Sequence, residues 1–346
     1  MLIGLLVITL HLLLRLDHAL MARLSEGFVH PVHKALAKLC AVFPFSVAEV
    51  LICLFFTVLL VYIILKLVRL RRAADKRREV YIIIMTPLCA AVCVYALFCV
   101  MWGTYYYGDD FVSKSGLTDK PVSVEQLERT TRYFAELDGE YSDRVSRDEN
   151  GVCNSDREKI LERSAYVFDN AEKKFPCLAG DRLCAKGFNF SRALSAVDFM
   201  GFFFPFTGEA NVNTDFPPAL LASTAAHELA HQRGVAEEQE ANFAAVLACL
   251  EYGDPDFVYS AALLAYIHLG NALYEADGDA WFEIYESLDG NVIADLEADR
   301  AYWQRFESPV QTVSDTVYEG FLQSYDQELG LESYGACVDL LVNYYG

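Results

Sequence analysis

The sequence predicts a mainly α-helical protein in two parts, a membrane region followed by a larger exported domain. Three observations predict this division. Apolar stretches fill most of the first hundred residues, acidic side chains dominate the rest, and apolar residues in the acidic part recur every three or four positions. We place the boundary after Trp102, which gives a membrane region at residues 1–102 and one globular domain at residues 103–346.

Three apolar stretches are candidate membrane spans, at residues 1–16, 47–66 and 80–102. The second and third reach the roughly 20 residues that a helix needs to cross a bilayer. The first is short, so the core of a signal peptide competes with an uncleaved span, although a basic start and a clear cleavage site are both missing. We favour the span, extended through residues 14–20 with Arg15 snorkelling to the membrane surface.

A basic loop at residues 66–79 predicts the orientation of the spans. Seven Lys or Arg side chains lie between residues 66 and 78, against the single acidic residue Asp75. Because basic loops stay in the cytoplasm, the chain after Trp102 should be extracytoplasmic. We therefore expect a multi-pass protein of the cytoplasmic membrane, with the lipid bilayer as its first partner.

The charge of the chain excludes one class of partner. Residues 1–102 carry eleven Lys or Arg and five Asp or Glu, a net charge of +6, so the whole-chain value of −20 leaves −26 for residues 103–346. Such an acidic domain is repelled by phosphates, and we expect no binding of nucleic acid. Cys177 and Cys184 could close a small disulfide loop in an oxidising compartment.

Periodicity and breakers outline the exported domain. We expect helices at residues 123–137 and 156–175 with a polar loop at 138–154 between them, and a glycine- and asparagine-bearing extended segment at residues 199–213. Asp215 then acts as the N-cap of a helix that runs through Arg233 to Gly234. Further helical patterns cover residues 236–252, 256–276, 280–306, 310–329 and 334–344.

The helix that ends at Gly234 carries an HExxH pattern at residues 227–231. Positions four apart share one face of a helix, so the imidazoles of His227 and His231 can meet one Zn²⁺ ion. Zinc with three protein ligands keeps a position for water and lowers the pKa of that water toward ~7. Glu228 would act as the general base. The competing interpretation is two ordinary core histidines.

The third ligand should be a downstream carboxylate, because the only other histidine after Trp102 is His268. Glu238 is preferred, since Asn242 lies four residues later and can accept a hydrogen bond from a ligating histidine. Glu240 and Glu237 stay open as alternatives. Glu240 points about 200° away from Glu238 around a helix, so the two cannot both face the metal.

Several segments resemble an uncharacterised bacterial family of membrane-anchored, metallopeptidase-like proteins, known as a domain of unknown function. They are HELAHQRG, EEQEANF, PFTGEANVN, FPFS at residues 43–46, WGTYYY at 102–107 and SYG at 333–335, together with the three apolar stretches. The likeness spans nearly the whole chain. More distantly, a glutamate on the helix after HExxH resembles the gluzincin peptidases, which implies a zincin-like domain with Glu238 as ligand and Asn242 where gluzincins usually have Asp.

The expected function is hydrolysis of peptide bonds in an extracytoplasmic protein or peptide. The alternatives are hydrolysis of another amide, such as cell-wall peptide, and a membrane-tethered binding protein in which zinc is structural. Asn211 and Asn213 are candidates for substrate contact, because an extended segment before the metal helix can receive a peptide. His268 is a candidate for stabilising the oxyanion. The sequence does not indicate an oligomeric state.

Overall fold

The computed structural model describes residues 1–118, 120–324 and 335–346. The chain divides into two compact units. Unit 1 holds Met1–Gly108 together with Phe204–Gly208, and unit 2 holds Asp109–Phe203 together with Glu209–Gly346. Each unit is described by itself.

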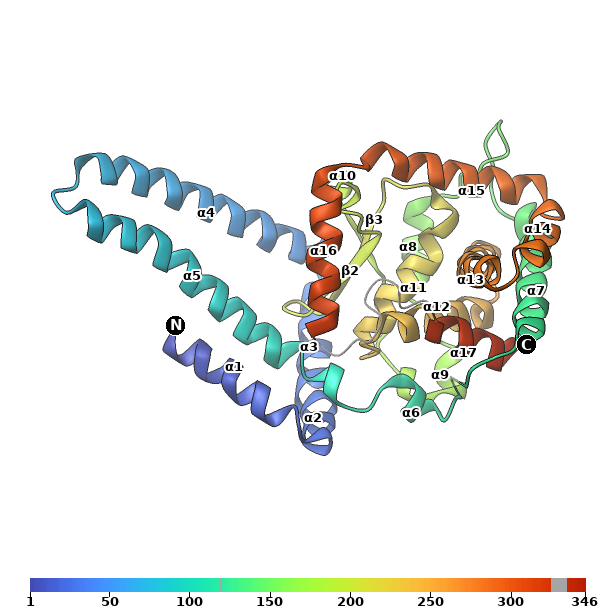
Figure 1. Ribbon diagram of the computed structural model, residues 1–346, viewed down its shortest axis with the longest axis horizontal. Coiled ribbons are helices and arrows are strands. Elements are labelled where there is room, and N and C mark those ends of the chain that lie inside the picture. The colour runs from blue at the N-terminus through green and yellow to red at the C-terminus, as the bar shows by residue number, and fades with distance from the viewer. Residues whose placement is uncertain (119, 325–334) are drawn as a thin grey trace. The chain divides into compact units, whose positions relative to one another are not determined.

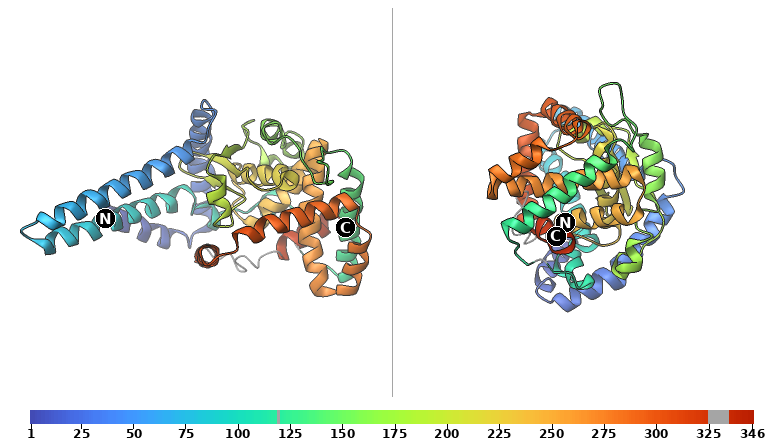
Figure 2. Two further views of the ribbon diagram at one scale, coloured as in Figure 1. Left: turned by 90° about the horizontal axis from the view of Figure 1, so that it is seen from above. Right: turned by 90° about the vertical axis from the view of Figure 1, so that its right-hand side faces the viewer.

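Two long helices dominate unit 1, α4 (Val47–Arg72) and α5 (Lys76–Met101), which lie side by side (Figures 1 and 2). Each begins at a side-chain cap, Ser46 for α4 and Asp75 for α5. Both have 26 residues, and none of the apolar window of α4 and 11% of that of α5 is buried. By length and composition, both are able to cross a membrane.

The first apolar stretch ends earlier than we expected. Helix α1 (Leu2–Leu14) contacts α5 but has only 13 residues. The expected continuation through residues 14–20 is wrong, because the carboxylate of Asp17 accepts a hydrogen bond from the Leu20 N–H and starts a new helix, α2 (His18–Leu24). Unit 1 also contains elements that we did not expect, a π-helical turn η1 (Ser25–Val29), α3 (His30–Cys40) and the 3₁₀ turn η2 (Tyr105–Tyr107).

Unit 2 is mostly helical and is built around α13, which Figure 1 shows nearly end-on. Like α4 and α5, α13 is long and apolar enough to span a membrane, but 72% of its apolar window is buried, so it is a core helix. It contacts α7, α11, α12, α14 and α17. The helices in chain order are α6 (Phe111–Ser115), α7 (Val124–Ser142), α8 (Arg157–Ser164), α9 (Ala171–Lys174), α10 (Ser191–Ser195), α11 (Leu221–Gln232), α12 (Glu238–Tyr252), α13 (Pro255–Ala276), α14 (Gly278–Glu286), α15 (Gly290–Trp303), α16 (Pro309–Ser324) and α17 (Gly335–Tyr345).

Two of the expected helices are each divided in two. The segment at 156–175 breaks after Ser164, whose hydroxyl donates to the Leu161 carbonyl and accepts the Ala185 N–H. The segment at 280–306 breaks where Asp289 caps α15 through the Asn291 N–H. By contrast, α7 runs on to Ser142, into the region expected to be a loop.

Some sequence expectations concern residues 325–334. Three expected features fall partly outside the described residues. They are the end of the helical pattern at 310–329, the start of the helical pattern at 334–344, and the first two residues of the SYG segment. The parts that are described form α16 and α17.

The extended segment at 199–213 is confirmed as strands β2 (Gly201–Phe204) and β3 (Glu209–Asn213). With β1 (Lys186–Phe188) they make a three-stranded sheet in the order β1-β3-β2, in which β1 runs parallel to β3. Every residue of the central strand β3 is buried, and β3 packs on α11. The sheet therefore supports the helix that carries the HExxH pattern.

The start of that helix differs from our expectation. Asp215 is not its N-cap, because the Asp215 carboxylate accepts a hydrogen bond from the Tyr302 hydroxyl. A 3₁₀ turn η4 (Pro218–Leu220) comes first, and α11 begins at Leu221. At the other end the helix stops before Gly234, whose φ of 91° is the left-handed conformation that glycine adopts most readily.

Small side chains allow α11, α12 and α13 to pack closely, since the separation of two helices depends on the side chains at their contact. The buried alanines are Ala222, Ala225, Ala226 and Ala230 on α11, Ala241, Ala244, Ala245 and Ala248 on α12, and Ala261, Ala262 and Ala265 on α13. The ten cysteines are all described and all are free thiols, so the disulfide that Cys177 and Cys184 could close is not formed.

Candidate metal centre

Helix α11 presents both histidines of the HExxH pattern on one face. The ring centroids of His227 and His231 are 4.6 Å apart and the rings are nearly perpendicular. His231 is buried and His227 is half-buried. This is the arrangement that a four-residue spacing on a helix predicts.

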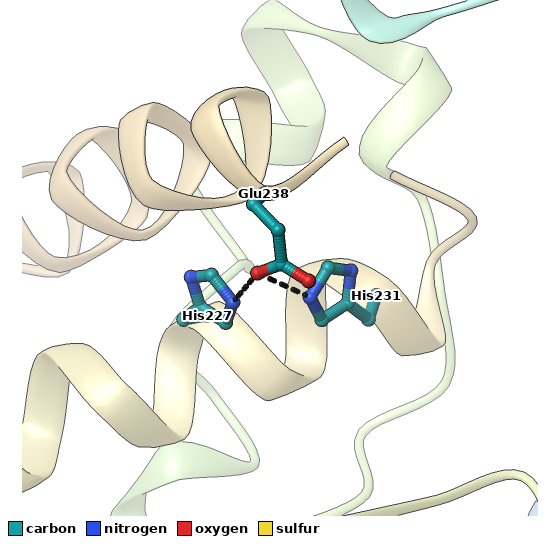
Figure 3. Close-up of side chains that lie close together, drawn as sticks. All are labelled: His227, His231 and Glu238. Atoms are coloured by element: carbon teal, nitrogen blue, oxygen red, sulfur yellow. Dashed lines mark hydrogen bonds and ion pairs between the residues drawn. The ribbon is translucent and has the colours of Figure 1, made fainter. Parts of the chain in front are cut away.

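Glu238, the first residue of α12, lies opposite the two histidines (Figure 3). Its Oε2 atom is 3.1 Å from Nε2 of His227 and 3.5 Å from Nε2 of His231. Ligand atoms of the three side chains lie within 4.8 Å of one another. Only the turn around Gly234 separates α11 from α12, and the two helices pack together, which brings the carboxylate to the histidines.

The remaining ring nitrogens of the two histidines face oxygen atoms. Nδ1 of His227 is 2.8 Å from Oδ1 of Asn242, and Nδ1 of His231 is 2.7 Å from the Val235 carbonyl. An acceptor oxygen requires a hydrogen on Nδ1, so Nε2 of each ring, which faces Glu238, is the nitrogen that could coordinate a metal when the ring is neutral. Two imidazole nitrogens and one carboxylate oxygen fit the ligand preferences of zinc, and their hydrogen-bond partners fit a metal site as well.

The charges of the three groups affect one another's pKa values. Burial alone would lower the pKa of His231, but the charge and hydrogen bond of Glu238 outweigh it and raise that pKa to about 9. Burial likewise opposes ionisation of Glu238, and the two histidines overcome it and hold the Glu238 pKa well below its usual value. The cluster therefore provides the ionised carboxylate that a cation would need.

Glu228 lies beside the cluster, on the side of the sheet. Burial raises its pKa to about 7, and the Oε2 atom has no hydrogen-bond partner among the described residues. A Cβ on Gly201 of β2 would lie 2.7 Å from Oε1 and 2.8 Å from Cγ of Glu228, and 2.9 Å from the Asn211 carbonyl. Real Cβ contacts are never this short, so glycine at this position makes room for the Glu228 carboxylate.

The two alternative glutamates lie outside this cluster. The carboxylate of Glu240 accepts hydrogen bonds from the backbone N–H groups of Phe111 and Val112, at 2.9 and 2.8 Å, in the first turn of α6. Glu237 is the residue that precedes the first turn of α12. Among the residues that the structure describes, His227, His231 and Glu238 form the only group of three candidate ligands.

Asn211 and Asn213 have an internal role, contrary to the expectation that they contact substrate. Both are fully buried in β3, the central strand of the sheet. The Asn211 amide donates to the carbonyl of Glu209, and the Asn213 amide donates to Ser195 Oγ and the Phe199 carbonyl. The Asn213 side chain ties the sheet to the preceding segment, and the Asn211 side chain bonds within β3.

His268 of α13 is buried, and it is not one of the three clustered donors. Burial, with a smaller contribution from the charge of nearby His227, lowers its pKa to about 4. The ring is therefore neutral near pH 7. A role in stabilising an oxyanion stays a prediction.

Sequence reasoning missed one residue of the site, Tyr318 on α16. Its hydroxyl donates a hydrogen bond of 2.8 Å to Oε1 of Glu238. The contacts to the two histidines are made by the other carboxylate oxygen, Oε2. The two residues are 80 positions apart in the chain, and no motif surrounds Tyr318. No sequence signal could have paired them.

A comparison with protein families gives one match. The family described as "Protein of unknown function (DUF3810)" matches residues 24–342. The chain belongs to the DUF3810 family. The matched residues include the two long apolar helices and the cluster of His227, His231 and Glu238. The description of the family names no activity. The DUF3810 chain has no match among curated proteins or solved structures.

Proposed function

We propose that this DUF3810 protein is a membrane-anchored zinc metallopeptidase. The observation that carries the proposal is the convergence of Nε2 of His227, Nε2 of His231 and Oε2 of Glu238 beside the buried carboxylate of Glu228. A zinc ion with three protein ligands acts as a Lewis acid and acidifies water. Any buried histidine needs a partner for its ring nitrogens, but two core histidines with no ligand role would not need to direct both Nε2 atoms at one carboxylate oxygen.

The residues of the site have separate roles in the proposed reaction. His227, His231 and Glu238 hold the metal, and the partners of the two Nδ1 atoms keep the rings in the ligating tautomer. Glu228 is the general base: its carboxylate takes a proton from the attacking water as the C–O bond forms, and returns it to the amide nitrogen as the C–N bond breaks. Water supplies both the oxygen and the protons, so hydrolysis needs no further reactant.

We further propose that α4 and α5 cross the cytoplasmic membrane and that unit 2 acts outside the cytoplasm on a protein or peptide. The support is the exposed apolar surface of both helices and the basic residues around the turn that joins them. Cys184 is exposed and lies in unit 2, so its reactivity can show on which side of the membrane unit 2 lies. Labelling of intact cells with a membrane-impermeant maleimide should modify wild type more strongly than Cys184→Ser, in which the partly exposed Cys177 remains. Labelling of Cys184 only after permeabilisation would place unit 2 in the cytoplasm.

The activity is tested on the full chain in detergent. Zinc per chain is measured by elemental analysis and cleavage of a mixed peptide library by mass spectrometry, for wild type, Glu228→Gln, and a control with the same chemical change at the exposed Glu158 of α8, Glu158→Gln. We expect one zinc per chain in all three, with cleavage lost only in Glu228→Gln. Equal zinc with no cleavage by any of them would instead favour a binding protein with structural zinc.

A further inference from the structure

The two carboxylate oxygens of Glu238 have different neighbours. Oε2 faces Nε2 of both histidines, at 3.1 and 3.5 Å. Oε1 accepts a hydrogen bond of 2.8 Å from the Tyr318 hydroxyl. The two oxygens therefore contact two different helices of unit 2. Oε2 contacts α11, which carries the HExxH pattern, and Oε1 contacts α16.

A carboxylate can bind a metal through one oxygen or through both. A catalytic zinc site needs a position that no protein atom fills, and a second carboxylate oxygen would compete for it. A phenol that donates to one oxygen draws electron density from it and fixes the rotation of the carboxylate plane. The oxygen that accepts the hydrogen bond becomes the weaker ligand, and the other stays directed at the metal.

We propose that Tyr318 is a positioning residue that holds Glu238 as a one-oxygen ligand and so keeps a coordination position open. The inference rests on the metal site proposed above. It assigns to α16 a direct part in the metal centre, although α16 lies 70 residues or more beyond the HExxH pattern.

The ring of Tyr318 is held in place independently of its hydroxyl. It packs edge-to-face on Phe199, with centroids 5.2 Å apart. One helical turn earlier, Ser314 Oγ donates to the Val197 carbonyl at 3.1 Å and anchors the same face of α16 to the same segment. Because these contacts need no phenolic oxygen, Tyr318→Phe should leave α16 docked and remove the hydrogen bond to Glu238.

The experiment uses the full chain in detergent, stripped of metal and titrated with Co²⁺ and, separately, with Zn²⁺ against a chromophoric chelator. Four-coordinate Co²⁺ absorbs visible light strongly, and five- or six-coordinate Co²⁺ absorbs weakly. We expect Tyr318→Phe to bind both metals, with a visible spectrum weaker than that of wild type and zinc affinity about tenfold lower. The matched control is Ser314→Ala, which loosens the anchor of α16 but keeps the hydroxyl, and it should resemble wild type in both measurements.

Three results would overturn the inference. The first is a Tyr318→Phe spectrum and affinity equal to those of wild type. The second is an equal change in Ser314→Ala, which would mean that docking of α16, and not the phenol, controls the site. The third is a wild type that binds neither metal, which would also remove the proposed metallopeptidase function; the first two leave that function standing, so the two failures are distinguishable.

Discussion

The Nδ1 atom of His227 lies 2.8 Å from the Oδ1 atom of Asn242, which stands one helical turn after Glu238 on α12. One helix thus supplies both a candidate ligand and the hydrogen-bond partner of another ligand. Because both depend on the start of α12, a shift of that helix would disturb the carboxylate and the imidazole together.

Asn242→Ala should weaken zinc binding by about 10- to 100-fold, because His227 loses the acceptor that fixes its tautomer and ring orientation. Asn242→Asp is the matched variant: its carboxylate accepts the same hydrogen bond more strongly, and affinity should equal or exceed that of wild type. Competition with a chromophoric chelator measures both. Unchanged affinity in Asn242→Ala would show that the contact has no part in metal binding.

Gly201→Ala should abolish peptide cleavage and leave zinc binding nearly intact. The added Cβ would overlap the Glu228 side chain and the Asn211 carbonyl, so the carboxylate must leave the position that it holds beside the metal ligands. Cleavage rate and zinc content of the same preparation are compared, with Gly278→Ala as control, since a Cβ at Gly278 meets nothing within 4 Å. Full activity in Gly201→Ala would show that cleavage does not depend on the place that the Glu228 carboxylate occupies next to Gly201.

Glu238 and Glu240, two residues apart, should fail in different ways. Glu238→Ala should lose zinc, whereas Glu240→Ala should keep it and lose roughly 1–3 kcal/mol of stability, because two backbone N–H groups of α6 lose the carboxyl oxygens that accept their hydrogen bonds. Zinc content and urea unfolding followed by tryptophan fluorescence separate the two. If Glu240→Ala lost zinc while Glu238→Ala kept it, the ligand assignment would be reversed.

The sequence could predict the parts of the site that lie close together in the chain. His227, Glu228 and His231 follow from the spacing of one helix, and Glu238 with Asn242 follows from the period of the next. The Tyr318 contact to Glu238 and the Glu240 contact to Phe111 bridge 80 and 129 positions, so only the packed fold reveals them.

The errors about helices have a common physical cause. Apolar periodicity continues across Asp17 and Asp289, although each of these residues caps the start of a new helix. Asp215 is the opposite case. Its position in the sequence is typical of an N-cap, but its carboxylate accepts a hydrogen bond from the hydroxyl of Tyr302, 87 residues away. Apolar periodicity indicates a helix, but hydrogen bonds of single side chains decide where it begins, local ones at Asp17 and Asp289 and a tertiary one at Asp215.

A buried acid far from the metal cluster gives a pH-dependent prediction. Asp138 on α7 is fully buried, and neither of its carboxylate oxygens has a hydrogen-bond partner among the described residues. Burial, reinforced by the charge of Asp295, raises its pKa well above the usual value. Asp295 accepts hydrogen bonds from Arg147 and from the Tyr259 hydroxyl, so these two donors are directed at Asp295 and not at Asp138.

Asp138→Asn should therefore change the pH dependence of stability. A carboxyl group with a raised folded pKa contributes most below its unfolded pKa of about 3.9, and its contribution falls as pH rises from there toward the folded pKa. The free energy of unfolding of wild type should decline relative to Asp138→Asn by as much as about 1.4 kcal/mol per pH unit in that range. The difference between the two chains, from urea unfolding in chelator between pH 4 and 8, isolates Asp138 because all other groups titrate in both. A difference that stayed constant with pH would mean that Asp138 ionises in the folded protein as readily as in the unfolded chain.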